Sequence, residues 1–138
     1  MQKSGSKGSK QIALVFLGTK GGGPVITETL CNEFRDVNIR PIIFLSKNNE
    51  KILNFKKVYP DNVVELPAPN TFYQAINPLT FAKCYLKVQA TIKSMNIKSV
   101  LIPMHHPYTV LMVPLLRIMG VKVFSAIHDF EAHKGDNN

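Results

Sequence analysis

The chain has 138 residues, of which 45% are hydrophobic and 19% charged, and its formal net charge is +8. These proportions are typical of one globular domain and exclude an intrinsically disordered chain. The apolar runs are too short to cross a bilayer, which needs about 20 apolar residues. The positive charge favours an anionic partner, but the basic residues are scattered and lack interleaved aromatics, so we expect no nucleic-acid binding.

The chain starts with MQKSGSKGSK, and we expect residues 1–10 to form a disordered basic tail before a single domain at 11–138. The apolar run that follows is short and has no cleavage site after it, so this is not a secretory signal. Cys31 and Cys84 fall within predicted helices. We expect two buried thiols rather than a disulfide, which favours a cytoplasmic protein.

Five apolar runs predict strands that are buried on both faces of a parallel sheet. Segments with helical spacing lie between them, one through Ile26, Leu30 and Phe34 and another from Phe81 to Met95. Alternating strands and helices build right-handed βαβ units. The sequence therefore predicts an α/β fold, a Rossmann-like open parallel sheet with helices on both faces in a single domain. The predicted strands are residues 12–17, 42–45, 63–66, 100–102 and 121–127.

Proline marks the start of two helices, because a proline at the first helical position loses no needed hydrogen bond. Gly23 is followed by Pro24, and Asn77 by Pro78. Residues 47–60 contain asparagines and several lysines, and we expect them to form an exposed, partly helical connection. Residues 67–73 are expected to form a loop.

The stretch LGTKGGGPVITETL follows the first predicted strand and invites comparison with phosphate-binding loops. A nucleotide-triphosphate loop needs a lysine before the helix and a serine or threonine after it. Pro24, Val25 and Ile26 stand in those places. The sequence therefore lacks the residues that this chemistry requires.

The dinucleotide pattern G-x-G-x-x-G also fails, because the glycines stand at positions 18, 21, 22 and 23. No acidic residue ends the second strand, where Ser46 and Lys47 stand. A glycine run before a helix still lets the backbone approach a ligand closely while free N–H groups face it. We expect an anionic or hydroxyl-rich ligand at Gly21, Gly22 and Gly23, and the alternative is a tight strand-to-helix turn.

Histidines follow the fourth and fifth predicted strands. His105 and His106 come after the fourth, and His128, Asp129 and His133 come after the fifth. The carboxyl ends of parallel strands share one edge of the sheet, where α/β proteins bind ligands. Three interpretations remain: a metal site, imidazoles that cap strand ends, and a binding or catalytic face for sugar hydroxyls or phosphate. Compact zinc spacing is absent, so we expect no metal, and the combined positions favour the third interpretation.

The glycine loop, the HHP after strand four and the segment GVKVFSAIHDFEAHKG together resemble the N-terminal domain of retaining GT-B glycosyltransferases of the family 4 type. The resemblance covers roughly residues 11–138. It implies one half of a two-domain GT-B enzyme, in which this half mainly holds the acceptor. The other half binds a nucleotide-sugar donor, and no metal or other cofactor is implied.

The resemblance also implies roles for individual residues. Gly21, Gly22 and Gly23 match the loop that reaches toward the donor's phosphates and sugar. His128 matches the histidine that contacts the transferred sugar, and we take His128 with Asp129 as the catalytic pair. Asp129 and His106 also match residues that shape the cleft, and His105, His106 and His133 complete the predicted ligand-binding set.

The donor-binding half is absent from this sequence, so we expect no transferase activity from the chain alone. The expected partners are a C-terminal donor-binding domain or partner subunit and a sugar or lipid-linked acceptor. A helix with Lys83, Lys87 and Lys93 could also rest on the inner face of a membrane, although a solvated helix face is favoured. The alternative function is a non-enzymatic Rossmann-like binding module or scaffold subunit for an anionic metabolite.

Overall fold

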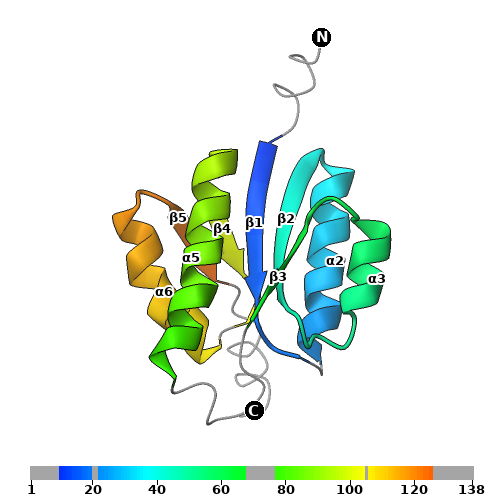
Figure 1. Cartoon of the computed structure of the whole chain (residues 1–138). Coiled ribbons are helices and arrows are strands. Elements are labelled where there is room, and N and C mark those ends of the chain that lie inside the picture. Colours follow the sequence, from blue (N-terminus) through cyan, green and yellow to red (C-terminus); the bar gives the residue numbers. More distant parts are fainter. Residues whose placement is uncertain (1–9, 20–21, 68–76, 105, 126–138) are drawn as a thin grey trace, which may run out of the picture.

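The computed structural model describes residues 10–19, 22–67, 77–104 and 106–125 (Figure 1). Strands and helices alternate along these residues, as the sequence predicts. The elements are β1 (Lys10–Phe16), α2 (Gly22–Asp36), β2 (Ile39–Ser46), α3 (Ile52–Val58), β3 (Val63–Leu66), α5 (Pro78–Met95), β4 (Ser99–Ile102), α6 (Pro107–Ile118) and β5 (Lys122–Ser125).

The five described strands form one sheet in the order β3-β2-β1-β4-β5, and every neighbouring pair is parallel. Figure 1 shows α2 and α3 on one side of the sheet and α5 and α6 on the other. This arrangement follows from right-handed crossovers that start at β1 and run outward in both directions. The predicted Rossmann-like single domain is confirmed.

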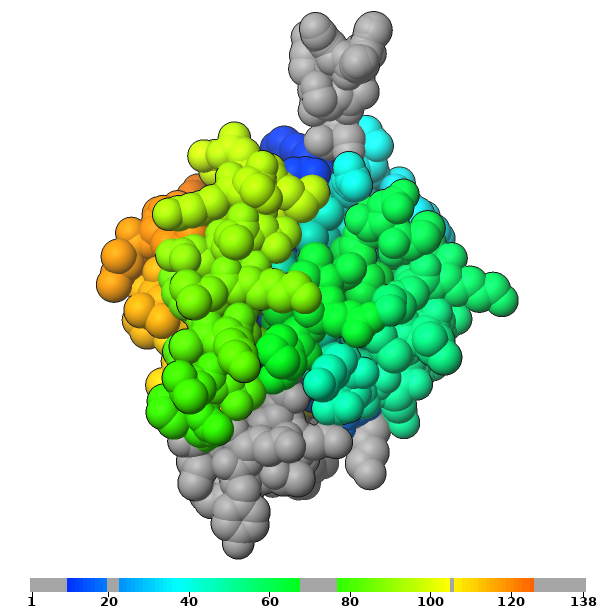
Figure 2. Space-filling model, viewed as in Figure 1, coloured from blue at the N-terminus to red at the C-terminus, as the bar shows by residue number. Residues whose placement is uncertain are grey.

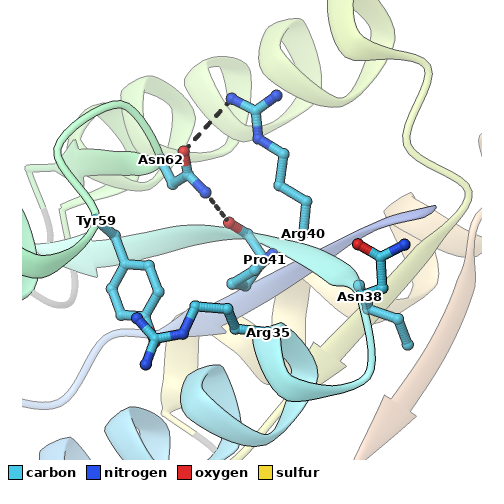
Figure 3. A pocket seen from close by; sticks show the side chains of 7 residues that line it. Arg35, Asn38, Arg40, Pro41, Tyr59 and Asn62 are labelled. Atoms are coloured by element: carbon cyan, nitrogen blue, oxygen red, sulfur yellow. Dashed lines mark hydrogen bonds between the residues drawn. The ribbon is translucent and has the colours of Figure 1, made fainter. Parts of the chain in front are cut away.

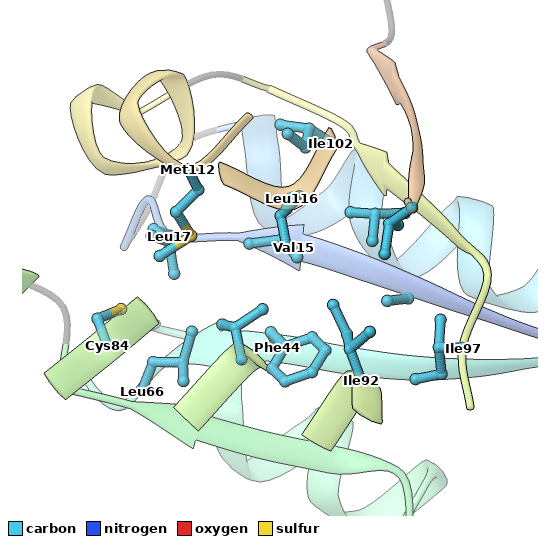
Figure 4. Packing of buried hydrophobic residues seen from close by; sticks show 14 of the residues in the cluster. Val15, Leu17, Phe44, Leu66, Cys84, Ile92, Ile97, Ile102, Met112 and Leu116 are labelled. Carbon is cyan, nitrogen blue, oxygen red and sulfur yellow. The ribbon is translucent and has the colours of Figure 1, made fainter. Parts of the chain in front are cut away.

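The sheet separates two hydrophobic cores, and alternate residues of β1 supply both. Val15 points to the side of α5 and α6, where Figure 4 shows it near Leu116. Leu14 and Phe16 belong to the core under α2 and α3. Because β1 is apolar on both faces, its sequence reads as a continuous hydrophobic run rather than an alternating one.

Each core contains one cysteine, and both lie within helices as predicted. Cys31 of α2 and Cys84 of α5 are fully buried free thiols on opposite sides of the sheet. Burial raises the pKa of each thiol to about 12. They act as small hydrophobic residues, because the reactive thiolate is disfavoured in these surroundings.

Some boundaries differ from the prediction. β1 begins at Lys10, inside the predicted tail, and β2 is longer than expected because it includes Pro41. The N–H of Ile43 donates to the Asn62 carbonyl on the β3 side, at 2.8 Å. The nitrogen of Pro41, two residues earlier, faces the same side before β3 has begun. The strand therefore loses no ladder hydrogen bond there.

The connection after β2 is more buried than predicted. The partly helical expectation for residues 47–60 is confirmed by α3. However, Asn49, Phe55 and Tyr59 are only 3%, 1% and 6% exposed. Phe55 and Tyr59 enter the core beneath α2, so the predicted exposure holds for most of this segment but not for these side chains.

α2 begins at Gly22, so Pro24 is its third residue rather than its first, whereas the start of α5 confirms the predicted proline position. Asn77 caps the helix, its side chain accepting a hydrogen bond from the Leu79 N–H at 2.9 Å, and Pro78 occupies the first turn. No helix among the described residues is long and apolar enough to cross a membrane.

Candidate functional site

The order of the strands defines a switch point between β1 and β4. From β1 the chain builds β2 and β3 on one side and then returns to build β4 and β5 on the other. At such a point the two following loops diverge and leave a crevice at the carboxyl ends of the strands. The glycine loop follows β1 and the predicted histidine segment follows β4, so these two motifs flank the switch point.

Phe16, Gly23 and Met104 bring the two motifs into contact. A Cβ atom at Gly23 would overlap Cζ of Phe16 and lie 3.2 Å from Sδ of Met104. Met104 stands just before the histidine pair. The structure therefore places the start of α2 against the end of β4, as predicted from the sheet edge, and it gives Gly23 a packing role.

The first turn of α2 lies at this junction and carries backbone donors. α2 begins at Gly22, and the first N–H groups of a helix have no partner within it. Pro24 supplies no N–H, which leaves the donors of Gly22, Gly23 and Val25 in the first turn. Thr27 donates its hydroxyl to the Gly23 carbonyl at 2.9 Å. Helix dipole and amides together favour an anion or a sugar oxygen at this end.

Asn49 holds the loop after β1 in place, a role that the sequence interpretation missed. Its Nδ2 donates to the Gly18 carbonyl at 3.4 Å, and its Oδ1 accepts from the Lys51 N–H at 2.8 Å. The N–H of Glu50 donates to the Thr19 carbonyl at 2.7 Å. An asparagine in the short connection between a buried strand and a helix was the available signal, because this residue type builds such turns.

His106 caps α6 at the end of β4. The Nδ1 atom of its ring accepts a hydrogen bond from the backbone N–H of Tyr108 at 3.1 Å. The backbone N–H of His106 donates to Thr109 Oγ1 at 2.8 Å. Burial lowers the pKa of this imidazole, so the ring is neutral near pH 7. With Nδ1 acting as acceptor, the proton of the neutral ring sits on Nε2. His106 thus combines a structural cap with one remaining donor.

The other predicted site residues lie outside the described residues: Gly21, His105, His128, Asp129 and His133. β5 pairs with β4 so that Ser125 lies opposite Ile102, and both strands end at the same edge of the sheet. Within the described part of the chain, no three histidine, cysteine or acidic side chains gather as metal ligands.

A pocket of about 200 Å³ lies at the opposite edge of the sheet, at the amino end of β2 (Figure 3). The Arg35 guanidinium lies 5.5 Å from the centre of the Tyr59 ring. Asn62 donates to the Pro41 carbonyl at 2.9 Å and accepts from Arg40 at 3.4 Å. These contacts tie α2, β2 and the turn before β3 together, away from the switch point.

No model of a known protein family matches the chain, and no curated protein matches its sequence. The structure is similar to the crystal structure of MurG from Acinetobacter baumannii, with a TM-score of 0.64 and 10% sequence identity. The similarity covers 84% of this chain and 34% of that one, and MurG is a GT-B glycosyltransferase.

The chain has the fold of one half of a GT-B glycosyltransferase. It spans about a third of the length of MurG. At 10% identity the similarity concerns the fold. Membership in family 4 and the retaining course of transfer stay predictions.

Proposed function

We propose that this chain is the acceptor-side half of a glycosyltransferase that moves a sugar from a nucleotide-sugar donor to a glycan or lipid-linked acceptor. One observation carries the proposal: in a fold similar to a GT-B half, the glycine loop and the end of β4 meet at the switch point through Phe16, Gly23 and Met104. That is the place where such a sheet binds ligands.

The described residues supply binding and orientation in this proposal. The amides of Gly22 and Gly23 approach the donor's phosphates or the transferred sugar, since Gly22 has no side chain to block a ligand at the start of α2. His106 offers its Nε2–H to a sugar hydroxyl or phosphate oxygen. The resemblance of the HDFEAHKG segment to family 4 enzymes supports a retaining reaction, with His128 and Asp129 at the reacting sugar.

The second half of the proposed enzyme is a donor-binding domain or subunit. It would carry most of the nucleotide contacts, so the 138-residue chain alone would have no transferase activity. The proposed setting is the cytoplasm, including the inner face of a membrane if the acceptor is lipid-linked.

Calorimetric titration of the purified chain with nucleotide sugars and free nucleotides tests whether most nucleotide contacts lie on the other half. We expect weak binding, with dissociation constants in the millimolar range, which correspond to a binding free energy of about −4 kcal/mol. A tagged copy isolated from the source cell in its native assembly should then transfer a radiolabelled sugar. A complete, tight nucleotide site in the isolated chain, with no transfer by the assembly, would instead identify a metabolite-binding module.

A further inference from the structure

A second pocket lies at the carboxyl end of β3, two strands from β1. Its volume is about 340 Å³. Its walls come from the turn after β2, the end of the edge strand β3 and the exposed side of α5. Figure 2 shows the face on which α5, β3 and α3 meet. The pocket is lined by Lys47, Glu65, Leu66, Pro67, Lys83 and Lys87.

Three lysines contribute to this pocket and none of them is paired with a carboxylate in the described part of the chain. The ion pairs there are Lys51 with Glu28 and Lys56 with Glu65. Glu65 is the one acidic residue that lines the pocket, and its carboxylate is already paired with Lys56 of α3, on the other side of the sheet. Its pairing with Lys56 leaves the pocket with an excess of positive charge.

The backbone of Glu65 fixes the orientation of one lysine. Lys87 donates its ammonium to the Glu65 carbonyl at 2.7 Å, which holds its charge over the edge of β3. An ammonium has three donors, so two remain. Lys83 stands one helical turn before Lys87, and like charges at this spacing destabilise a helix unless an anion lies between them.

We propose that this pocket binds a phosphate group. A phosphate carries up to two negative charges and several acceptor oxygens, which suit three ammonium groups from two separate elements better than a single carboxylate does. The pocket opens at the same edge of the sheet as the switch point. If the proposed function holds, the phosphate belongs to the acceptor, and that assignment alone rests on the proposed function.

Inorganic pyrophosphate is the probe for the test, with binding followed by calorimetry and amide chemical shifts of the full chain at two salt concentrations. The variant Lys83→Gln/Lys87→Gln should weaken binding at least about tenfold, as expected for losing charge-assisted hydrogen bonds. The matched control Lys93→Gln/Lys98→Gln removes the same charge from the last turn of α5 and the connection before β4, and it should change binding less than about twofold. Equal losses in both variants, or no binding by the wild type, would overturn the site.

Vesicles distinguish a lipid headgroup from a soluble phosphate. The chain is mixed with phosphatidylcholine vesicles containing phosphatidic acid, with and without pyrophosphate. Vesicle binding that pyrophosphate and the Lys83→Gln/Lys87→Gln variant both abolish assigns a lipid phosphate, and pyrophosphate binding without vesicle binding assigns a soluble one. Either result supports the site. Sugar transfer by the native assembly is measured separately, so failed transfer with intact pyrophosphate binding would reject the proposed function only.

Discussion

The ring of Phe16 occupies the space in which a side chain at position 23 would lie. Both the Cζ and Cε1 atoms of the ring stand within 2.5 Å of a Cβ built on Gly23. Phe16 is 4% exposed and belongs to the core under α2 and α3, so the ring has little room to move aside. Packing, in addition to any ligand, therefore requires glycine at the start of α2.

Gly23→Ala should destabilise the protein by about 1 to 3 kcal/mol, because overpacking forces buried side chains off their preferred positions. Denaturant unfolding measures the change. In the background of Phe16→Leu, which lacks the atoms nearest Gly23, the same substitution should cost less. Additive effects in this double-mutant cycle would contradict the direct contact.

Gly22→Leu should abolish sugar transfer by the native assembly, since a side chain at the first position of α2 would block close approach of a ligand to the backbone. The circular dichroism spectrum should stay that of the wild type. Thr29→Ala, on the exposed side of the same helix, serves as the control and should retain transfer. Full transfer by Gly22→Leu would remove this loop from the proposed mechanism.

His106 should make the protein sensitive to acid. Its folded pKa is lowered by burial below the ordinary 6.5, so the unfolded chain binds more protons below that pH. The stability associated with the neutral ring is complete above pH 6.5 and decreases as the pH falls through the folded pKa. Urea midpoints at neutral and acidic pH measure this loss.

Two substitutions of His106 separate its roles. Asparagine is a good N-cap that does not titrate, so His106→Asn should keep the stability at pH 7 and reduce the loss of stability in acid. His106→Ala removes the cap and should cost about 1 kcal/mol of stability at pH 7. An unchanged acid loss in His106→Asn would assign that loss to other groups. If Nε2–H contacts a ligand, His106→Asn should also lower transfer without loss of fold.

Asn49→Ala should loosen the loop after β1. The substitution removes the contacts to Gly18 and Lys51, and the lost buried hydrogen bonds should cost about 1 to 3 kcal/mol. Hydrogen exchange of the amides near Gly18 should accelerate, while amides in α6 keep their protection. Acceleration that is uniform over the whole chain would indicate global destabilisation instead of a local brace.

The sequence indicated which residues would be buried in the sheet. It did not indicate which side chains from distant elements contact one another. The run around Val15 predicted a doubly buried strand because apolar residues on both faces leave no solvent side. The helix at residues 107–118 was not singled out, since its outward face also carries Val110 and Leu111, which are 55% and 54% exposed. Its spacing therefore lacks the polar stripe by which a surface helix is recognised.

The sequence by itself determined the fold class, the start of α5 at Pro78 and the edge at which the glycine loop and His106 lie, because strand polarity and turn chemistry are local properties. Only the tertiary structure decided that Phe16 fills the place of a side chain at Gly23, that Asn49 braces the loop and that three lysines line one pocket beside β3. Each of these contacts joins residues from separate elements, and their approach depends on packing across the sheet rather than on neighbours in the sequence.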